Sequence, residues 1–72
     1  MSVYKVIEIV GTSDVSWEDA AAKAVERAGK TLEDLRIGEV VTQDVTINNG
    51  LVTAYRTKLS VSFKFKEGWG KF

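Results

Sequence analysis

The sequence predicts an α+β domain of order β-α-β-β, in which a three-stranded antiparallel sheet curves around one helix. Residues 3–10 are rich in β-branched and aromatic side chains, which strands favour. Apolar residues then recur at helical spacing from Trp17 to Ala28. Finally, Asn48-Asn49-Gly50 separates two strand-like segments, and Asn-Gly is a strong signal for the tight turn of a β-hairpin.

The predicted helix follows Gly11-Thr12-Ser13, a turn that we expect to end the first strand. Ser16 stands three residues before Asp19, which is the spacing of an N-cap and an acidic residue in the first turn. Gly29 is the predicted C-cap. Trp17 is interpreted as a core or interface anchor. It heads an apolar stripe of otherwise small residues that brings the helix close to the sheet: Trp17, Ala20, Ala21, Ala24, Val25 and Ala28.

Two further strands are predicted over residues 36–47 and 51–66, after a short connection at 30–35. In the second of them, apolar and polar side chains alternate. Such alternation gives one face to a core and the other to water or a polar cavity. The apolar members are Leu59, Val61, Phe63 and Phe65.

The last predicted strand is long for a chain of 72 residues, because strands usually run about five or six residues. One short helix cannot cover it, and uncovered strand edges favour association with other chains. We therefore predict an obligate homo-oligomer whose folded domain is residues 1–66. Residues 67–72, which include Trp69, form a predicted C-terminal tail that is either flexible or folded over a neighbouring subunit.

The composition excludes several classes of function. The chain has no cysteine and no histidine, so zinc–water chemistry and Ser-His or Cys-His catalysis cannot occur within it. Ten basic residues balance ten acidic ones, whereas nucleic-acid-binding proteins normally carry a basic excess. No segment approaches the roughly 20 apolar residues of a membrane span, and the N-terminus lacks a signal-peptide pattern. We expect a cytoplasmic protein that is not an enzyme and binds neither nucleic acid nor membranes.

Four segments between residues 4 and 65 resemble the dodecin family. They are YKVIEIVGTS, A-x-x-A-x-x-R-A-x-K-T-L, E-V-V-x-Q and Y-R-x-K-L-x-V-S-F. The resemblance implies a β-α-β-β subunit that assembles into a hollow, cubic-symmetry shell of twelve identical chains. It also implies a storage or sequestering role without catalysis, because flavin-binding dodecins hold FMN or riboflavin in pairs at subunit contacts and protect them.

The positions that bind flavin in the resembling family hold different residues here. Ile37 stands where flavin-binding dodecins have the tryptophan that stacks on the isoalloxazine ring. Arg56 replaces a glutamine that bonds the flavin edge, and Asp44 replaces an arginine near the flavin phosphate. Ile37 cannot supply aromatic stacking, and Asp44 would repel a phosphate. The ligand-binding residues that the resemblance implies are Arg36, Ile37, Gly38, Gln43, Asp44, Arg56 and Lys58.

The basic residues of this set have two interpretations. Arg36, Arg56 and Lys58 either attract a nucleotide-like anion near a subunit contact or form inter-subunit ion pairs with Glu39 and Asp44. In the first case they would contribute to a ligand site. In the second they would stabilise the assembly.

The alternative function is a flavin-independent dodecin that binds divalent cations. Carboxylate oxygens suit calcium or magnesium, and one acid per chain can build a site where symmetry brings its copies together. Asp14, Glu18 and Asp19 are the candidate metal ligands. Helix capping explains Glu18 and Asp19 equally well, whereas Asp14 lies on the predicted turn and is the first candidate.

Overall fold

The computed structural model describes residues 3–64, and within this range the chain forms three strands and one helix in the predicted order. The elements are β1 (Tyr4–Ser13), α1 (Trp17–Gly29), β2 (Leu35–Asn48) and β3 (Leu51–Lys64). The predicted tail at 67–72, with Trp69, lies outside the described residues, as does Phe65. No helix among the described residues is long and apolar enough to cross a membrane.

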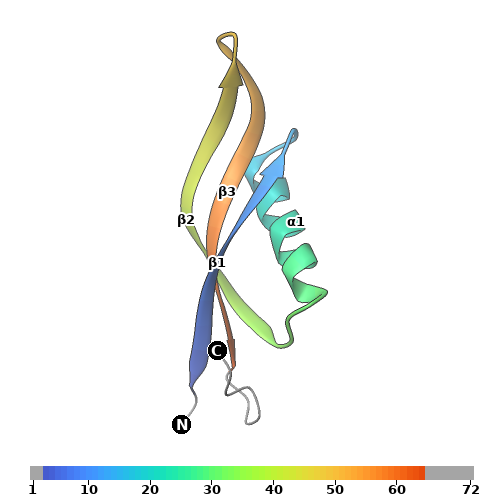
Figure 1. Ribbon diagram of the computed structural model, residues 1–72, viewed down its shortest axis with the longest axis vertical. Helices are drawn as coiled ribbons and strands as arrows, with labels where there is room; N and C mark the ends of the chain where they lie inside the picture. The colour runs from blue at the N-terminus through green and yellow to red at the C-terminus, as the bar shows by residue number, and fades with distance from the viewer. Residues whose placement is uncertain (1–2, 65–72) are drawn as a thin grey trace.

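β3 is the central strand of the antiparallel sheet, whose order is β1-β3-β2. Figure 1 shows α1 alongside the sheet and the β2–β3 hairpin extending beyond the end of β1. The pairing of β1 with β3 ends at Ser13 opposite Tyr55, so the part of β3 before Tyr55 pairs with β2 alone. The chain is consequently elongated, with extents of 50 × 20 × 19 Å.

The predicted break after the first strand is wrong, because β1 continues through Gly11-Thr12-Ser13. Gly11 pairs with Thr57 in the sheet. A methyl group at Gly11 would collide with the carbonyl oxygen of Ala20 and lie 2.8 Å from the Cβ of Ala24. The glycine therefore serves the close approach of α1 to β1, as glycines within strands often do.

The start of α1 agrees with the prediction, and its end does not. The Ser16 side chain accepts a hydrogen bond from the backbone N–H of Asp19 at 3.0 Å, which confirms the N-cap. Gly29 is instead the last helical residue. The C-cap is Lys30, in right-handed conformation with φ −73° and ψ −23°. The left-handed residue comes later, at Asp34 (φ 59°), immediately before β2.

The turn between β2 and β3 is the predicted tight hairpin. Asn49 and Gly50 have φ angles of 52° and 75°, and Asn48 pairs with Leu51 across them. Two central residues with positive φ define a type I′ turn, which matches the twist of the flanking strands. Local turn chemistry was therefore sufficient to predict this connection.

The hydrophobic core of one subunit is small. The alternation predicted for the third strand is confirmed within the described residues, because Leu59, Val61 and Phe63 are buried, together with Ala20 of α1. By contrast, many large apolar side chains of the sheet are exposed to solvent in a single chain: Val6, Val10, Ile37, Val40, Val41, Ile47, Leu51 and Val52. The fold thus leaves much of its apolar surface uncovered.

Candidate ligand-binding site

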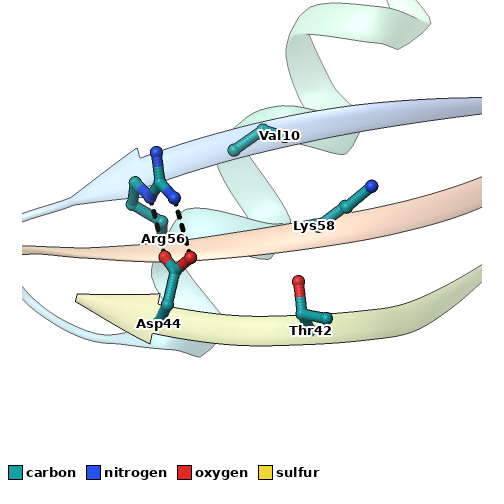
Figure 2. Close-up of a pocket in the computed structure, with 5 residues that line it drawn as sticks. All are labelled: Val10, Thr42, Asp44, Arg56 and Lys58. Atoms are coloured by element: carbon teal, nitrogen blue, oxygen red, sulfur yellow. Dashed lines mark hydrogen bonds and ion pairs between the residues drawn. The ribbon is translucent and has the colours of Figure 1, made fainter. Parts of the chain in front are cut away.

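Two cavities in the described part of the chain are relevant to ligand binding. The larger of the two lies on the face of the sheet that is turned away from α1. Its volume is about 310 Å³, and all three strands contribute to its walls. Arg56 and Lys58 belong to this face because they alternate with Thr57 and Leu59, which are buried. Figure 2 shows the lining side chains, which are Val10, Thr42, Asp44, Arg56 and Lys58.

A two-pronged ion pair occupies one side of this cavity. Nε of Arg56 lies 2.7 Å from Oδ1 of Asp44, and Nη2 lies 2.7 Å from Oδ2. The two residues are direct partners in the β2–β3 register. The hydrogen bonds from Arg56 lower the pKa of Asp44, and the carboxylate in turn raises the pKa of Arg56. An incoming anion would have to displace this carboxylate to reach the same edge of the guanidinium.

Lys58 is also paired within the chain. Its Nζ lies 3.3 Å from Oε1 of Glu8 on β1. Both cations at the cavity thus have an acidic partner in the same subunit. The expected partnership of basic residues with Asp44 occurs here for Arg56, and it forms between adjacent strands of one chain.

Trp17 connects the start of α1 to the same region of β2. Its indole N–H donates a hydrogen bond to the backbone carbonyl of Asp44 at 2.9 Å. Its ring meets that of Tyr55 edge-on, with centroids 5.1 Å apart and planes at 73°. The hydroxyl of Thr57, which is fully buried, donates to the carbonyl of Trp17 at 2.9 Å. Trp17 therefore anchors the start of α1 to the sheet, as predicted. Its indole N–H is already used in a hydrogen bond within the chain.

The smaller cavity, of about 90 Å³, lies beside the start of β2 and the later turns of α1. Ile37 is 68% exposed at its edge. The lining residues are Val25, Leu35, Arg36, Ile37, Gly38 and Val61.

The predicted ligand-binding set is therefore divided within one chain. Arg36, Ile37 and Gly38 line the smaller cavity, and the other charged members line the larger one. Gln43 is exposed on β2, opposite Thr57. Sequence reasoning missed three contributors, Val10, Thr42 and Glu8, because only the register of β1 and β2 against β3 brings them to Lys58.

The candidate metal ligands cluster around the start of α1, but Asp19 is already engaged. Its carboxylate accepts a hydrogen bond from the hydroxyl of Ser13 at 2.5 Å and forms an ion pair with Lys23 at 2.9 Å. Ser13 foremost, and then Lys23, lower the pKa of Asp19. Asp14 and Glu18 are exposed. Within residues 3–64 of a single chain, no three acidic residues converge as a metal site would require.

Comparison with known proteins agrees with the fold and with the sequence segments described above. The family model for Dodecin matches residues 3–66. Calcium dodecin from Mycobacterium tuberculosis is 52% identical over 66 residues, covering 92% of this chain and 93% of the relative. Its crystal structure superposes with a TM-score of 0.80, covering 90% of this chain and 93% of that one.

Two further relatives give the same result. Dodecin from Thermus thermophilus is 42% identical over 65 residues, which is 90% of this chain and 94% of the relative. The structure of dodecin from Streptomyces davaonensis superposes with a TM-score of 0.85 at 32% identity, covering 92% of this chain and 97% of that one. The β-α-β-β chain therefore belongs to the dodecin family of small-ligand-binding proteins.

Proposed function

We propose that this chain is the subunit of a non-catalytic homododecameric shell that sequesters calcium. The observation that carries the choice of ligand is the 52% identity to a relative named calcium dodecin, over nearly the whole of both chains. The geometry of the chain supports the shell and disfavours flavin. The absence of cysteine and histidine from the sequence agrees with a role in binding and not in catalysis.

The uncovered apolar surface supports the assembly. Val6 and Val10 on β1 and Ile37 on β2 are each more than half exposed in the isolated chain. Large apolar side chains left exposed in this number favour contact with other chains. A domain of 72 residues also gains stability from assembly that its small core cannot supply.

Three residues disfavour flavin as the ligand. Ile37 has no ring to stack on an isoalloxazine, and stacked aromatic pairs contribute about 0.5–1.5 kcal/mol beyond burial. Asp44 places a carboxylate in the larger cavity, and its ion pair with Arg56 withholds one edge of the guanidinium from a phosphate. FMN or riboflavin thus remains a family-based alternative that this binding surface supports poorly.

Asp14 and Glu18 are the proposed calcium ligands. Both are exposed near the start of α1, and carboxylate oxygens are ligands that calcium prefers. Asp19 contributes less directly, because Ser13 and Lys23 occupy its carboxylate. Since a single chain lacks a three-acid cluster among its described residues, the proposed site is completed by the same residues of symmetry-related subunits.

Calcium binding can be tested by native mass spectrometry of the assembled protein before and after treatment with a chelator. We expect bound calcium in the untreated protein, and a loss of calcium without a change in chain number in Asp14→Asn. Glu26→Gln is the matched control, because Glu26 is an exposed acid on α1 outside the proposed site. The proposal is wrong if the assembled protein binds no calcium at millimolar concentration, and the ligand assignment is wrong if Asp14→Asn and Glu18→Gln both bind as the control does.

A further inference from the structure

The tip of the β2–β3 hairpin carries an exposed Asn-Gly pair. Figure 1 shows that the tip stands apart from α1 and from the end of β1. Asn49 and Gly50 are both exposed, and no heavy atom from a more distant part of the chain lies within 4 Å of where a Cβ on Gly50 would be. Nothing in the described part of the chain shields the peptide bond between them from water.

The Asn49 side chain also makes no hydrogen bond to another residue within the described range 3–64. Its amide group is therefore not held in place by the fold. The next residue has no side chain to hinder its backbone nitrogen. These are the conditions under which an asparagine side chain is attacked by the nitrogen of the following residue.

We propose that Asn49 is a site of spontaneous deamidation and isoaspartate formation. The backbone nitrogen of Gly50 loses its proton and bonds to Cγ of Asn49, the Cγ–Nδ2 bond breaks, and the nitrogen leaves as ammonia. Water then opens the resulting five-membered succinimide. Breaking the bond between the ring nitrogen and Cγ gives aspartate, and breaking the bond to the backbone carbonyl carbon gives isoaspartate. No oxidant or reductant is needed.

The native turn controls the rate of this reaction. Ring closure requires rotation about the Cα–C bond of Asn49, and a type I′ turn with φ angles of 52° and 75° does not allow that rotation while it remains closed. The reaction therefore proceeds through local opening of the hairpin tip. Hairpin ends and exposed loops are the parts of a protein that open most readily.

Two threonines hold the hairpin together just below the tip. The hydroxyls of Thr46 and Thr53 lie 2.6 Å apart, and the Thr53 hydroxyl lies 3.2 Å from the backbone carbonyl of Thr46. The strand register is irregular between Thr46 and Ile47, immediately beyond this contact. The Thr46–Thr53 contact thus opposes the separation of the two strands that opens the tip.

Deamidation alters the tip in two ways. Each product adds one negative charge to a chain whose formal net charge is zero. Isoaspartate also adds a methylene to the backbone, so the two-residue loop no longer fits the type I′ geometry. The product is therefore separable by charge, and its turn is expected to loosen.

The test is peptide mapping by mass spectrometry after incubation of the intact protein at neutral and mildly alkaline pH. We expect the mass increase that accompanies replacement of an amide NH2 by OH at Asn49, with aspartate and isoaspartate both present and the rate rising with pH. Asn48 is the internal control, because it is paired in the strand and is followed by a residue with a side chain. Asn49 should convert several-fold faster than Asn48.

Thr53→Val tests the opening step, because valine has nearly the same shape as threonine and lacks the hydroxyl. We expect faster conversion of Asn49 in this variant, and equal rates in the variant and the unmodified protein would contradict the opening step. A sample unfolded in urea serves as the positive control for the assay. If Asn49 converts in urea but not in the folded protein, or converts no faster than Asn48, the proposed site is refuted.

Discussion

At the residue scale, two of the residues that differ from the flavin-binding pattern, Asp44 and Arg56, form one ion pair. Asp44 and Arg56 replace two family residues of different type, and the sequence suggests an ion pair between them only across a subunit contact. The β2–β3 register places them directly opposite each other, where they form a two-pronged ion pair. Sequence reasoning found both positions but could not place their ion pair within one chain, because the register depends on bulges between Leu35 and Ile47 that no local sequence pattern indicates.

The weak affinity expected for flavin can be tested by restoring the missing ring. Ile37→Trp places an aromatic side chain at an exposed position beside the smaller cavity. We expect tighter binding of riboflavin and stronger quenching of its fluorescence, because stacking contributes about 0.5–1.5 kcal/mol per pair. Ile37→Leu is the control, since it changes shape without adding a ring. Tight quenching by the unmodified protein would show that another ring stacks on flavin.

The contacts of Asp19 predict a dependence of stability on pH. Hydrogen bonds from Ser13, foremost, and from Lys23 hold the pKa of Asp19 below its ordinary value. A group whose pKa is lower in the folded state stabilises the fold above its unfolded pKa, and that contribution is lost as pH falls through the folded pKa. We expect the unfolding temperature to fall less below pH ~4 in Asp19→Asn than in the unmodified protein. Parallel acid profiles of the two proteins, followed by circular dichroism, would contradict this.

At the element scale, the sequence specified the order of the elements and one of their connections, but it misplaced two of their ends. Asn49-Gly50 was identified because a type I′ turn needs those residue types locally. Gly11 was misread because a glycine that breaks a strand and a glycine that admits a helix look alike in sequence. Gly29 was misread as the C-cap, whereas it is the last helical residue and Lys30 is the cap.

The contact between α1 and β1 at Gly11 predicts the effect of enlarging Ala24. Because the Cβ of Ala24 already faces Gly11 closely, a leucine there must push the helix from the sheet. Overpacking of this kind typically costs about 1–3 kcal/mol. We expect Ala24→Leu to lower the unfolding temperature and to promote dissociation of the assembly. Ala22→Leu, on the exposed face of α1, should have little effect, and equal tolerance of both would mean that the buried face is wrongly assigned.

At the scale of the whole molecule, one subunit is an incomplete structure. Its long hairpin and its exposed apolar side chains on β1 and β2 follow from a sheet that one helix of thirteen residues cannot cover. The sequence predicted this shortage from strand length alone. It could not predict which residues remain uncovered, because their exposure depends on the twist and register of the whole sheet. The cation site proposed at Asp14 and Glu18 needs symmetry-related copies of both residues, because residues 3–64 of one chain hold no three-acid cluster.

The mass of the protein in solution tests the central claim most directly. Native mass spectrometry or light scattering of the purified protein at micromolar concentration should return twelve times the 8.0 kDa of the single chain. We expect this mass to persist on dilution, because burial of the exposed apolar surface opposes dissociation. A mass of one or two chains under the same conditions would contradict the proposal that this subunit forms a shell.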